Sequence, residues 1–153
     1  MTAGLPVFDK TIQETNLWLK AVEQELEPCE RHEAYDALRA VMHALRDRLQ
    51  PESAMHLAAQ LPLLLRGVYT EGWVLAKGPS NEHTAMQLGY RVMSELPPFF
   101  PINADRCLGA VFKVMSERMD EGLIAKVKDQ LPGPIRRAWP EALPLTARRL
   151  TNA

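Results

Sequence analysis

The chain has 153 residues, enough for one domain with a buried core or for two halves packed closely together. Hydrophobic residues make up 46% and charged residues 24%, which excludes a chain that is disordered throughout. The net charge of −1 argues against binding to a nucleic-acid backbone, which requires a strongly basic surface.

The N-terminus and the cysteines predict a cytoplasmic protein. MTAGLPVFDK has neither the basic nor the apolar region of a signal peptide, and no segment approaches the roughly 20 apolar residues of a membrane helix. Cys29 and Cys107 have no metal-site or disulfide spacing, so we expect two reduced thiols. We predict no membrane association, no cofactor and no metal.

Helical periodicity predicts four helices in the first half of the chain, at about residues 9–26, 31–49, 51–61 and 62–68. Thr11 and Glu14 have the spacing of a capping box for the first helix, and Asp9 is an alternative N-cap. Prolines separate the helices, because proline disfavours helix in the preceding residue and suits a first turn. These prolines are Pro28, Pro51 and Pro62.

The second predicted helix is strongly amphipathic. At about 100° per residue, one face gathers apolar residues for a core: Ala34, Leu38, Val41, Met42, Leu45 and Leu49. The opposite face is polar and carries His32, Asp36, Arg39, His43, Arg46, Asp47 and Gln50.

The second half follows a connector at residues 72–80. We expect a helix at about 81–96, a break at PPFFP, and further helices with N-caps at Asn103 and Asp120. Pro132 divides the last pair of helices, and residues 140–153 are expected to be an irregular tail. Gln60 and Gln130, each just before a proline break, are expected to bind groups that the broken helix leaves unpaired.

The two halves are related by an internal repeat. Residues 34–69 superpose without gaps on residues 104–139, 70 positions later, and 13 of the 61 pairs between 9–69 and 79–139 are identical. We therefore predict an all-α fold of two similar bundles, each with about four helices and a short last one, packed pseudo-symmetrically as one compact unit. Its predicted parts are repeat one (1–71), the connector (72–80), repeat two (81–139) and the tail (140–153).

The segment LRAVMHALRDRLQPESAMHLAAQLPLLLRGVYTEGW, with the weaker copy ending DEGLIAKVKDQLPGPIRRAWP, resembles the bacterial family called domain of unknown function 2267. The resemblance covers roughly residues 8–139. It implies an all-helical, cytosolic bacterial protein and supplies no activity, ligand or catalytic residue. The second copy diverges more, since Gly109 and Ser116 replace Arg39 and Arg46.

Charged residues that recur in both repeats predict structural ion pairs. An arginine at the edge of an apolar face needs a carboxylate or free helix-end carbonyls. We expect Glu25 to pair with Arg48 or Arg66 inside repeat one. In repeat two we expect Glu95 to pair with Arg118 or Arg136.

Repeat two does not reproduce the polar stripe Arg39, His43, Arg46 and Asp47, so we infer that the fold does not require it. The stripe could bind an anionic ligand or a partner, or it could be a solvated face with i,i+4 pairing. His43 and Asp47 could share a metal, but no third ligand is evident.

No nucleophile, phosphate-loop or metalloprotease motif occurs in the chain, so we assign no catalytic residue. We predict a non-enzymatic helical interaction or adaptor module, with an unknown protein partner or self-association. The alternative is a small anionic-ligand or metal-binding protein that uses the Arg39 to Asp47 stripe. Nucleic-acid binding comes third, limited to the basic residues at 126–153.

Overall fold

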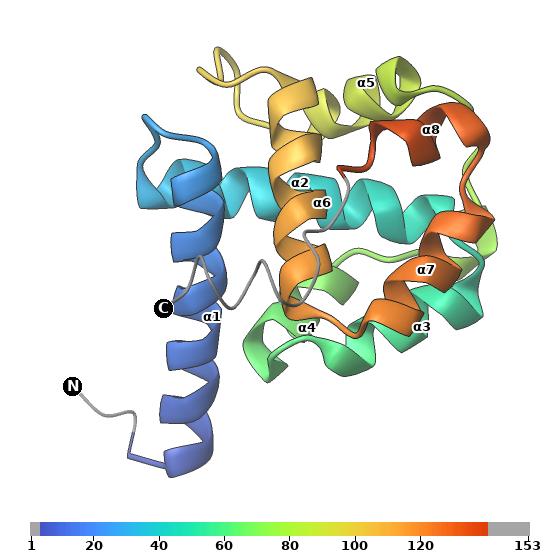
Figure 1. The fold of residues 1–153 in the computed structure, drawn as a ribbon. Helices are drawn as coiled ribbons and strands as arrows, with labels where there is room; N and C mark the ends of the chain where they lie inside the picture. Colours follow the sequence, from blue (N-terminus) through green and yellow to red (C-terminus); the bar gives the residue numbers. More distant parts are fainter. Residues whose placement is uncertain (1–3, 141–153) are drawn as a thin grey trace.

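The computed structural model describes residues 4–140, and within them all regular structure is helical (Figure 1). The helices are α1 (Pro6–Glu25), α2 (Arg31–Arg48), α3 (Pro51–Gln60), α4 (Leu63–Thr70), α5 (Ala85–Glu95), α6 (Ala104–Arg118), α7 (Glu121–Gln130) and α8 (Gly133–Ala138), with a 3₁₀ turn η1 (Leu75–Lys77) in the connector. The predicted all-α fold is confirmed. Most of the predicted tail, residues 141–153, lies outside the described residues.

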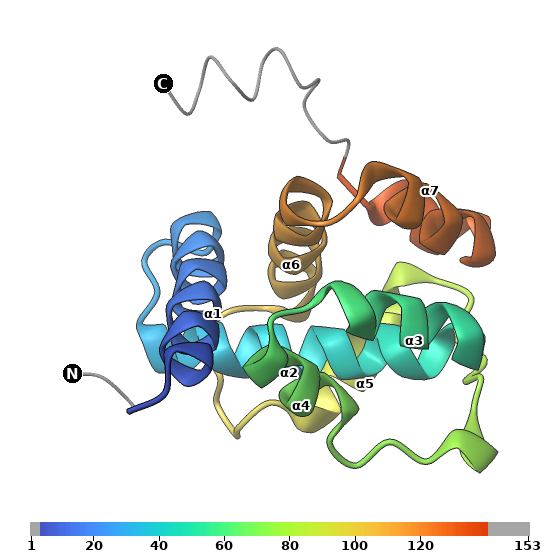
Figure 2. The ribbon, with the colours of Figure 1, turned by 90° about the horizontal axis from the view of Figure 1, so that it is seen from below.

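α2 is the central helix of the structure. It runs across the molecule, and α1 and α6 cross it side by side (Figures 1 and 2). α3, α4 and α5 also pack against α2. The predicted apolar face of this helix is buried, from Ala34 to Leu49, and joins one continuous core with the inner faces of the other helices.

The two halves share their core through reciprocal contacts. α1 packs against α2 and α4 of its own half and against α6 of the other half. α5, the helix that corresponds to α1 in the second half, packs against α6 and α8 of its own half and against α2 of the other. A duplicated unit would produce such reciprocal contacts between the halves. The repeat itself and its boundaries stay predictions from the sequence.

Two of the predicted helix starts are formed as expected. The side chain of Asn103 accepts a hydrogen bond from the Arg106 amide at the start of α6, and Asp120 accepts one from the Leu123 amide at the start of α7. These bonds satisfy amides that a helix leaves without an internal partner.

Two other predicted starts are wrong. α1 begins at Pro6, so Thr11 is buried within the helix and accepts a hydrogen bond from the Leu64 amide of α4 instead of capping α1. α5 begins at Ala85 and not near residue 81, because Thr84 and Gln87 form the capping box that sets its first turn.

Helix length and composition also bear on the membrane prediction. Between residues 4 and 140, no helix is both long and apolar enough to cross a bilayer.

Candidate functional site

The predicted site residues of α2 lie beneath other elements. His43 is 2% exposed and Arg46 is 4% exposed, while Arg39 and Asp47 are partly buried. α4, α5 and the connector cover this side of α2. A solvated face is therefore wrong for His43 and Arg46, because both side chains are covered by these elements.

His43 connects three helices. Its Nε2 lies 2.7 Å from the carbonyl oxygen of Val68 in α4, and its Nδ1 lies 2.8 Å from Oε2 of Glu95 in α5. A carbonyl oxygen can only accept, so Nε2 carries a hydrogen and donates it. Arg39 lies 3.7 Å from the same Glu95 oxygen and 3.4 Å from Glu71. Both ring nitrogens of His43 are thus engaged inside the protein, and neither is free to bind a metal.

Arg46 holds the C-terminal end of α4. Its Nη1 donates to the carbonyl oxygens of Tyr69 and Glu71 at 2.8 and 2.9 Å, and its Nε donates to Oδ1 of Asp47 at 2.8 Å. The guanidinium carbon lies 5.8 Å from the centre of the Trp73 ring. A cation at this position satisfies carbonyls that the helix leaves unpaired and complements the helix dipole.

Asp47 is shared between two arginines, since Nη2 of Arg91 donates to its other oxygen at 3.0 Å. Burial acts to raise the pKa of Asp47, but the hydrogen bonds from Arg46 and Arg91 hold that pKa below its ordinary value. Glu82 binds Nη1 of Arg91 at 3.2 Å. Its pKa is also lowered: burial opposes the change, while the Ser80 hydroxyl, the Glu82 backbone and Arg91 favour the charged form.

A polar cavity of about 180 Å³ adjoins this cluster. Its lining consists of Arg46, Asp47, Gly72, Val74, Lys77, Gly78 and Arg91. Arg39 and His43 are not part of the lining, so the structure does not bring the four predicted residues together around one cavity. Three cations around the space would suit a small anion, but both guanidinium groups already donate to carboxylates.

The recurring glutamates join the two halves. Glu25 binds Nζ of Lys113 at 2.8 Å, and Glu95 binds Nδ1 of His43 at 2.8 Å. Lys113 occupies the repeat-two position that corresponds to His43, as Glu95 corresponds to Glu25, so the two pairs are reciprocal. Lys113 thus makes in the second half the contact that His43 makes in the first.

The arginines expected to bind these glutamates bind other groups. The predicted pairings of Glu25 with Arg48 or Arg66, and of Glu95 with Arg118 or Arg136, are wrong, because the last turns of α1 and α5 face the opposite half. Arg48 donates to the carbonyl oxygen of Glu82 at 2.7 Å, and Arg118 is exposed.

Arg66 and Arg136 bind helix-end carbonyls, the other type of partner considered for these arginines. Nε of Arg66 donates to Ala58 at 2.9 Å and its Nη2 donates to Leu61 at 3.2 Å. Nε of Arg136 donates to Lys128 at 3.0 Å and its Nη2 donates to Leu131 at 3.1 Å. Each acceptor in the second half occupies the repeat position of its counterpart in the first, so the same corner is built twice.

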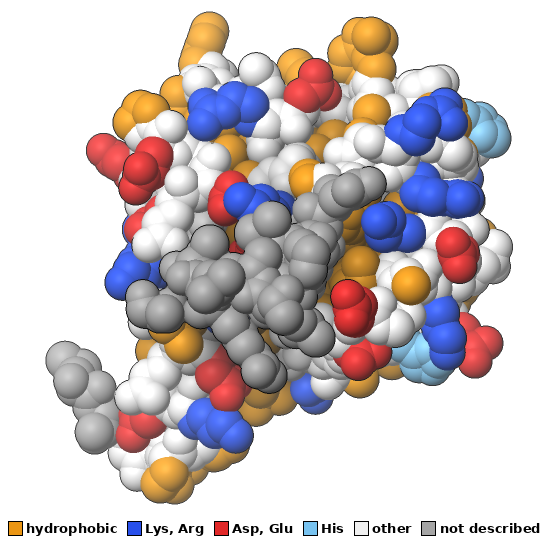
Figure 3. All heavy atoms as spheres, viewed as in Figure 1, with side chains coloured by type: hydrophobic (Ala, Val, Ile, Leu, Met, Phe, Trp, Pro, Cys, Tyr) orange, Lys and Arg blue, Asp and Glu red, His pale blue; other side chains and the backbone are white. Residues whose placement is uncertain are grey.

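Exposed apolar side chains gather on α5 and the segment after it. Met86, Tyr90 and Met93 are 66%, 63% and 56% exposed and follow one another at i, i+4 and i+7, which places them on one face of the helix. Phe99, in the following segment, is fully exposed. Figure 3 shows hydrophobic side chains projecting at the upper edge of the molecule, over α5 and that segment. We call Met86, Tyr90, Met93 and Phe99 the α5 face.

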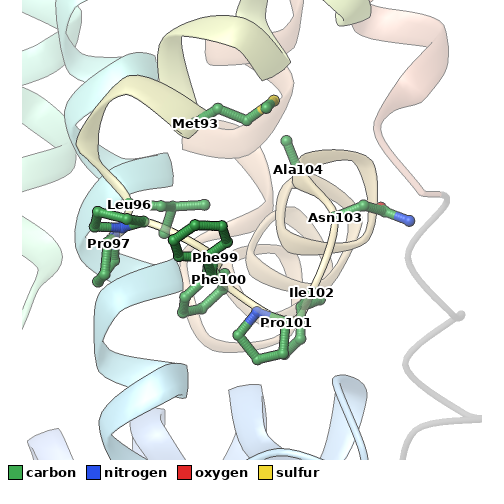
Figure 4. Close-up of a pocket in the computed structure, with 10 residues that line it drawn as sticks. Met93, Leu96, Pro97, Phe99, Phe100, Pro101, Ile102, Asn103 and Ala104 are labelled. Carbon is green, nitrogen blue, oxygen red and sulfur yellow. The ribbon is translucent and has the colours of Figure 1, made fainter.

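A groove of about 580 Å³ adjoins the α5 face (Figure 4). It is lined by Met93, Leu96, Pro97, Pro98, Phe99, Phe100, Pro101, Ile102, Asn103 and Ala104, none of which carries a charge. Phe99 has a φ of 59°, a left-handed conformation that costs a non-glycine residue about 1–3 kcal/mol. The backbone thus holds a large apolar side chain in water at the edge of an apolar groove.

The corresponding face of α1 is polar. Asn16, Lys20 and Glu23 occupy the repeat-one positions that correspond to Met86, Tyr90 and Met93. Arg31 covers part of that face, with Nε 2.6 Å from Glu23 and Nη1 3.3 Å from Asn16. The fold is therefore compatible with polar side chains at these positions.

The α5 face was not among the sites predicted from the sequence. Its three helical residues have the i, i+4, i+7 spacing of one helix face, and their counterparts in repeat one are not apolar. The same spacing is typical of a buried core stripe, so the sequence alone does not show that this face is exposed.

Comparison with known families matches residues 15–143 to the family model described as "Uncharacterized conserved protein (DUF2267)". The chain belongs to the DUF2267 family. This match confirms the predicted resemblance over most of the chain. The search of curated proteins finds no match.

The thiols of this DUF2267 protein are poorly suited to nucleophilic chemistry. Burial, followed by the nearby Cys29, raises the pKa of Cys107 to about 11, so its thiolate is scarce at neutral pH. Burial also raises the pKa of Cys29, and Glu33 and Glu23 add to the effect. Both cysteines are free of disulfide bonds. Within residues 4–140, no cluster of three or more His, Cys, Asp or Glu could hold a metal ion.

Proposed function

We propose that this DUF2267 protein is a non-enzymatic interaction module whose docking surface is the α5 face. The observation that carries the proposal is an exposed apolar stripe at positions where the other half of the same fold is polar. Burying apolar area is the main driving force of protein association, and large aromatic and methionine side chains are enriched in interface cores. The partner would present an uncharged apolar surface, since the groove beside Phe99 offers no charge to pair with.

The engagement of the polar stripe of α2 inside the protein supports this choice. Arg39, His43, Arg46 and Asp47 each bind protein groups and tie α2 to α4 or α5. Their role in the proposal is to fix α5 on α2, so that the exposed stripe is displayed on a rigid element.

The small polar cavity favours the alternative function, binding of a small anion. Arg46, Lys77 and Arg91 supply positive charge there, but Asp47 and Glu82 already bind the two arginines. We rank this alternative second for that reason. Metal binding by His43 and nucleic-acid binding have less support. We also propose that the protein is cytoplasmic, because its two cysteines are free thiols.

Site-specific photo-cross-linking in cells of the source organism tests the docking surface. p-Benzoylphenylalanine would replace Tyr90 in one variant and Lys20, its counterpart on α1, in the control. We expect a discrete cross-linked product at position 90 and none at position 20, because only the first lies on an apolar exposed face. No discrete product at position 90, or equal products at both positions, would contradict the proposal.

A further inference from the structure

We propose that the α5 face binds the same face of a second copy of this chain. The two α5 helices would lie antiparallel about a two-fold axis that passes beside Tyr90. This inference rests on the proposed docking function and names its occupant.

The order of side chains along α5 suits a two-fold axis. In a closed dimer the same surface patch meets itself. Met86 precedes Tyr90 by four residues and Met93 follows it by three, so the exposed stripe has nearly the same sequence of shapes in both directions. Antiparallel pairing would set Tyr90 against its own copy and Met86 against the partner's Met93.

The charges of α5 are arranged in the way that a two-fold contact requires. Such a contact places each charge near its own copy, which is unfavourable unless the charges are neutralised or absent. The charged residues of α5 are Arg91 and Glu95. Arg91 is bound to Asp47 and Glu82, and Glu95 is bound to His43, so both are neutralised by groups of their own chain. Asp105 of α6 is a further charge beside Met86, and it lies at the rim of the contact rather than on the stripe.

Phe99 has a place in this arrangement. It follows Met93 in the chain, so in an antiparallel pair it would lie beyond the partner's Met86. There the surface has a second hollow of about 390 Å³, lined by Ala85, Met86, Asp105, Leu108, Gly109 and Ala138. Phe99 would fill this hollow in the other copy, and the left-handed backbone at Phe99 would be offset by the contact.

The area of the α5 face sets the expected strength of the contact. Aromatic side chains bury about 150–250 Å² each, so the four exposed side chains offer on the order of 500 Å² per copy. The pair would bury on the order of 1,000 Å² in total, which lies at the low end of interface sizes, among weak and transient contacts. We therefore expect a weak, reversible dimer.

Light scattering and sedimentation at protein concentrations on the order of 1–100 μM test whether the chain dimerises reversibly. The wild-type mass is expected to rise from 17.2 kDa toward twice that value. A variant with Met86→Asn, Tyr90→Lys and Met93→Glu carries the residues of α1 at these positions and should stay at 17.2 kDa. Leu17→Gln, which removes an exposed leucine of α1 in the same way, should behave as the wild type.

Disulfide trapping provides a second measurement that does not depend on the triple variant. In a Cys29→Ser background, Tyr90→Cys should give a cross-linked dimer under mild oxidation, because the axis passes beside this position. Mixing Met86→Cys with Met93→Cys should give a heterodimer faster than either variant cross-links alone.

A wild-type chain that stays at 17.2 kDa at every concentration would overturn the dimer, as would a triple variant that still dimerises. The cross-linking experiment at position 90 separates the two proposals. A product with a different protein, together with a monomeric mass, overturns the dimer and leaves the docking surface standing. Absence of any product at position 90 contradicts both.

Discussion

Asp47 lies between two guanidinium groups, with Nε of Arg46 at 2.8 Å and Nη2 of Arg91 at 3.0 Å. Arg46 is 4% exposed, and a buried guanidinium without a counter-charge would be strongly destabilising. Asp47 therefore compensates the arginine that caps α4 and, through Arg91, attaches α5 to α2. The Asp47 carboxylate thus helps to hold α2, α4 and α5 together.

Replacing Asp47 with Asn should lower the free energy of unfolding by about 1–2 kcal/mol at pH 7, because two charge-assisted hydrogen bonds are lost. The folded pKa of Asp47 is below its ordinary value of 3.8. Its contribution is therefore full above that pH and is lost as the pH falls through the folded pKa. Urea unfolding of both proteins across pH 2–7 measures this, and a difference that stays constant down to pH 2 would exclude the role assigned to the carboxylate.

The corners between α3 and α4 and between α7 and α8 show how a short element is held. Pro62 and Pro132 are the N-caps of α4 and α8, so the preceding helix must stop and leave carbonyls without amide partners. Arg66 and Arg136 reach back from the following helix to those carbonyls. One side chain thereby joins two consecutive helices across the proline break.

Arg66→Ala should lower the free energy of unfolding by about 1 kcal/mol, and Arg136→Ala by a similar amount, because they remove three and two hydrogen bonds to helix-end carbonyls. Arg66→Lys should recover only part of the loss, since an ammonium group cannot reproduce the two-pronged geometry of a guanidinium. Thermal unfolding with Arg137→Ala, an exposed neighbour, as the control measures the effect. Equal losses for Arg137→Ala and Arg136→Ala would show that charge alone matters there.

The whole molecule depends on contacts exchanged between its halves. Glu25 and Glu95 each reach the second helix of the opposite half, and Gln60 and Gln130 also cross between the halves, at the other end. Oε1 of Gln60 accepts a hydrogen bond from the Asp120 amide at the start of α7, and Gln130 binds Ser53 near the start of α3. The sequence predicts that these glutamines satisfy their own broken helix, but they join α3 to α7 instead.

The two reciprocal glutamate pairs should contribute unequally to stability. Glu95→Ala should cost about 2 kcal/mol, because it leaves the buried ring of His43 without one of its partners. Glu25→Ala should cost about 0.5 kcal/mol, because Lys113 is 38% exposed and can turn to water. Urea unfolding of both variants gives the two values, and equal losses would contradict the unequal burial as the cause.

The sequence predicts the fold better than it predicts the surface. Leucine and valine spacing identifies the helices, and prolines identify the corners, because both depend on local geometry. The partner of Glu25 or Glu95 depends on how the halves pack, which no local pattern contains.

The positions where the repeats differ show the same limit. Arg46 and Ser116 occupy equivalent positions, and the sequence suggests that an arginine there is dispensable. In the structure, Ser116 accepts a hydrogen bond from the indole of Trp139, which also stacks on Phe112 with ring centres 4.1 Å apart. Trp139 stands where repeat one has the smaller Tyr69, so the two halves fill the same space with different partners.

The contrast between the outer helices α1 and α5 sets a limit on assembly. If both carried the apolar stripe, every chain would have two adhesive edges, and growth could continue into fibres. Asn16, Lys20 and Glu23, two of them bound by Arg31, make this face of α1 polar, so α1 presents no second copy of the stripe. If the α5 face pairs with itself as proposed, that contact uses up the stripe of both chains and therefore ends at a pair.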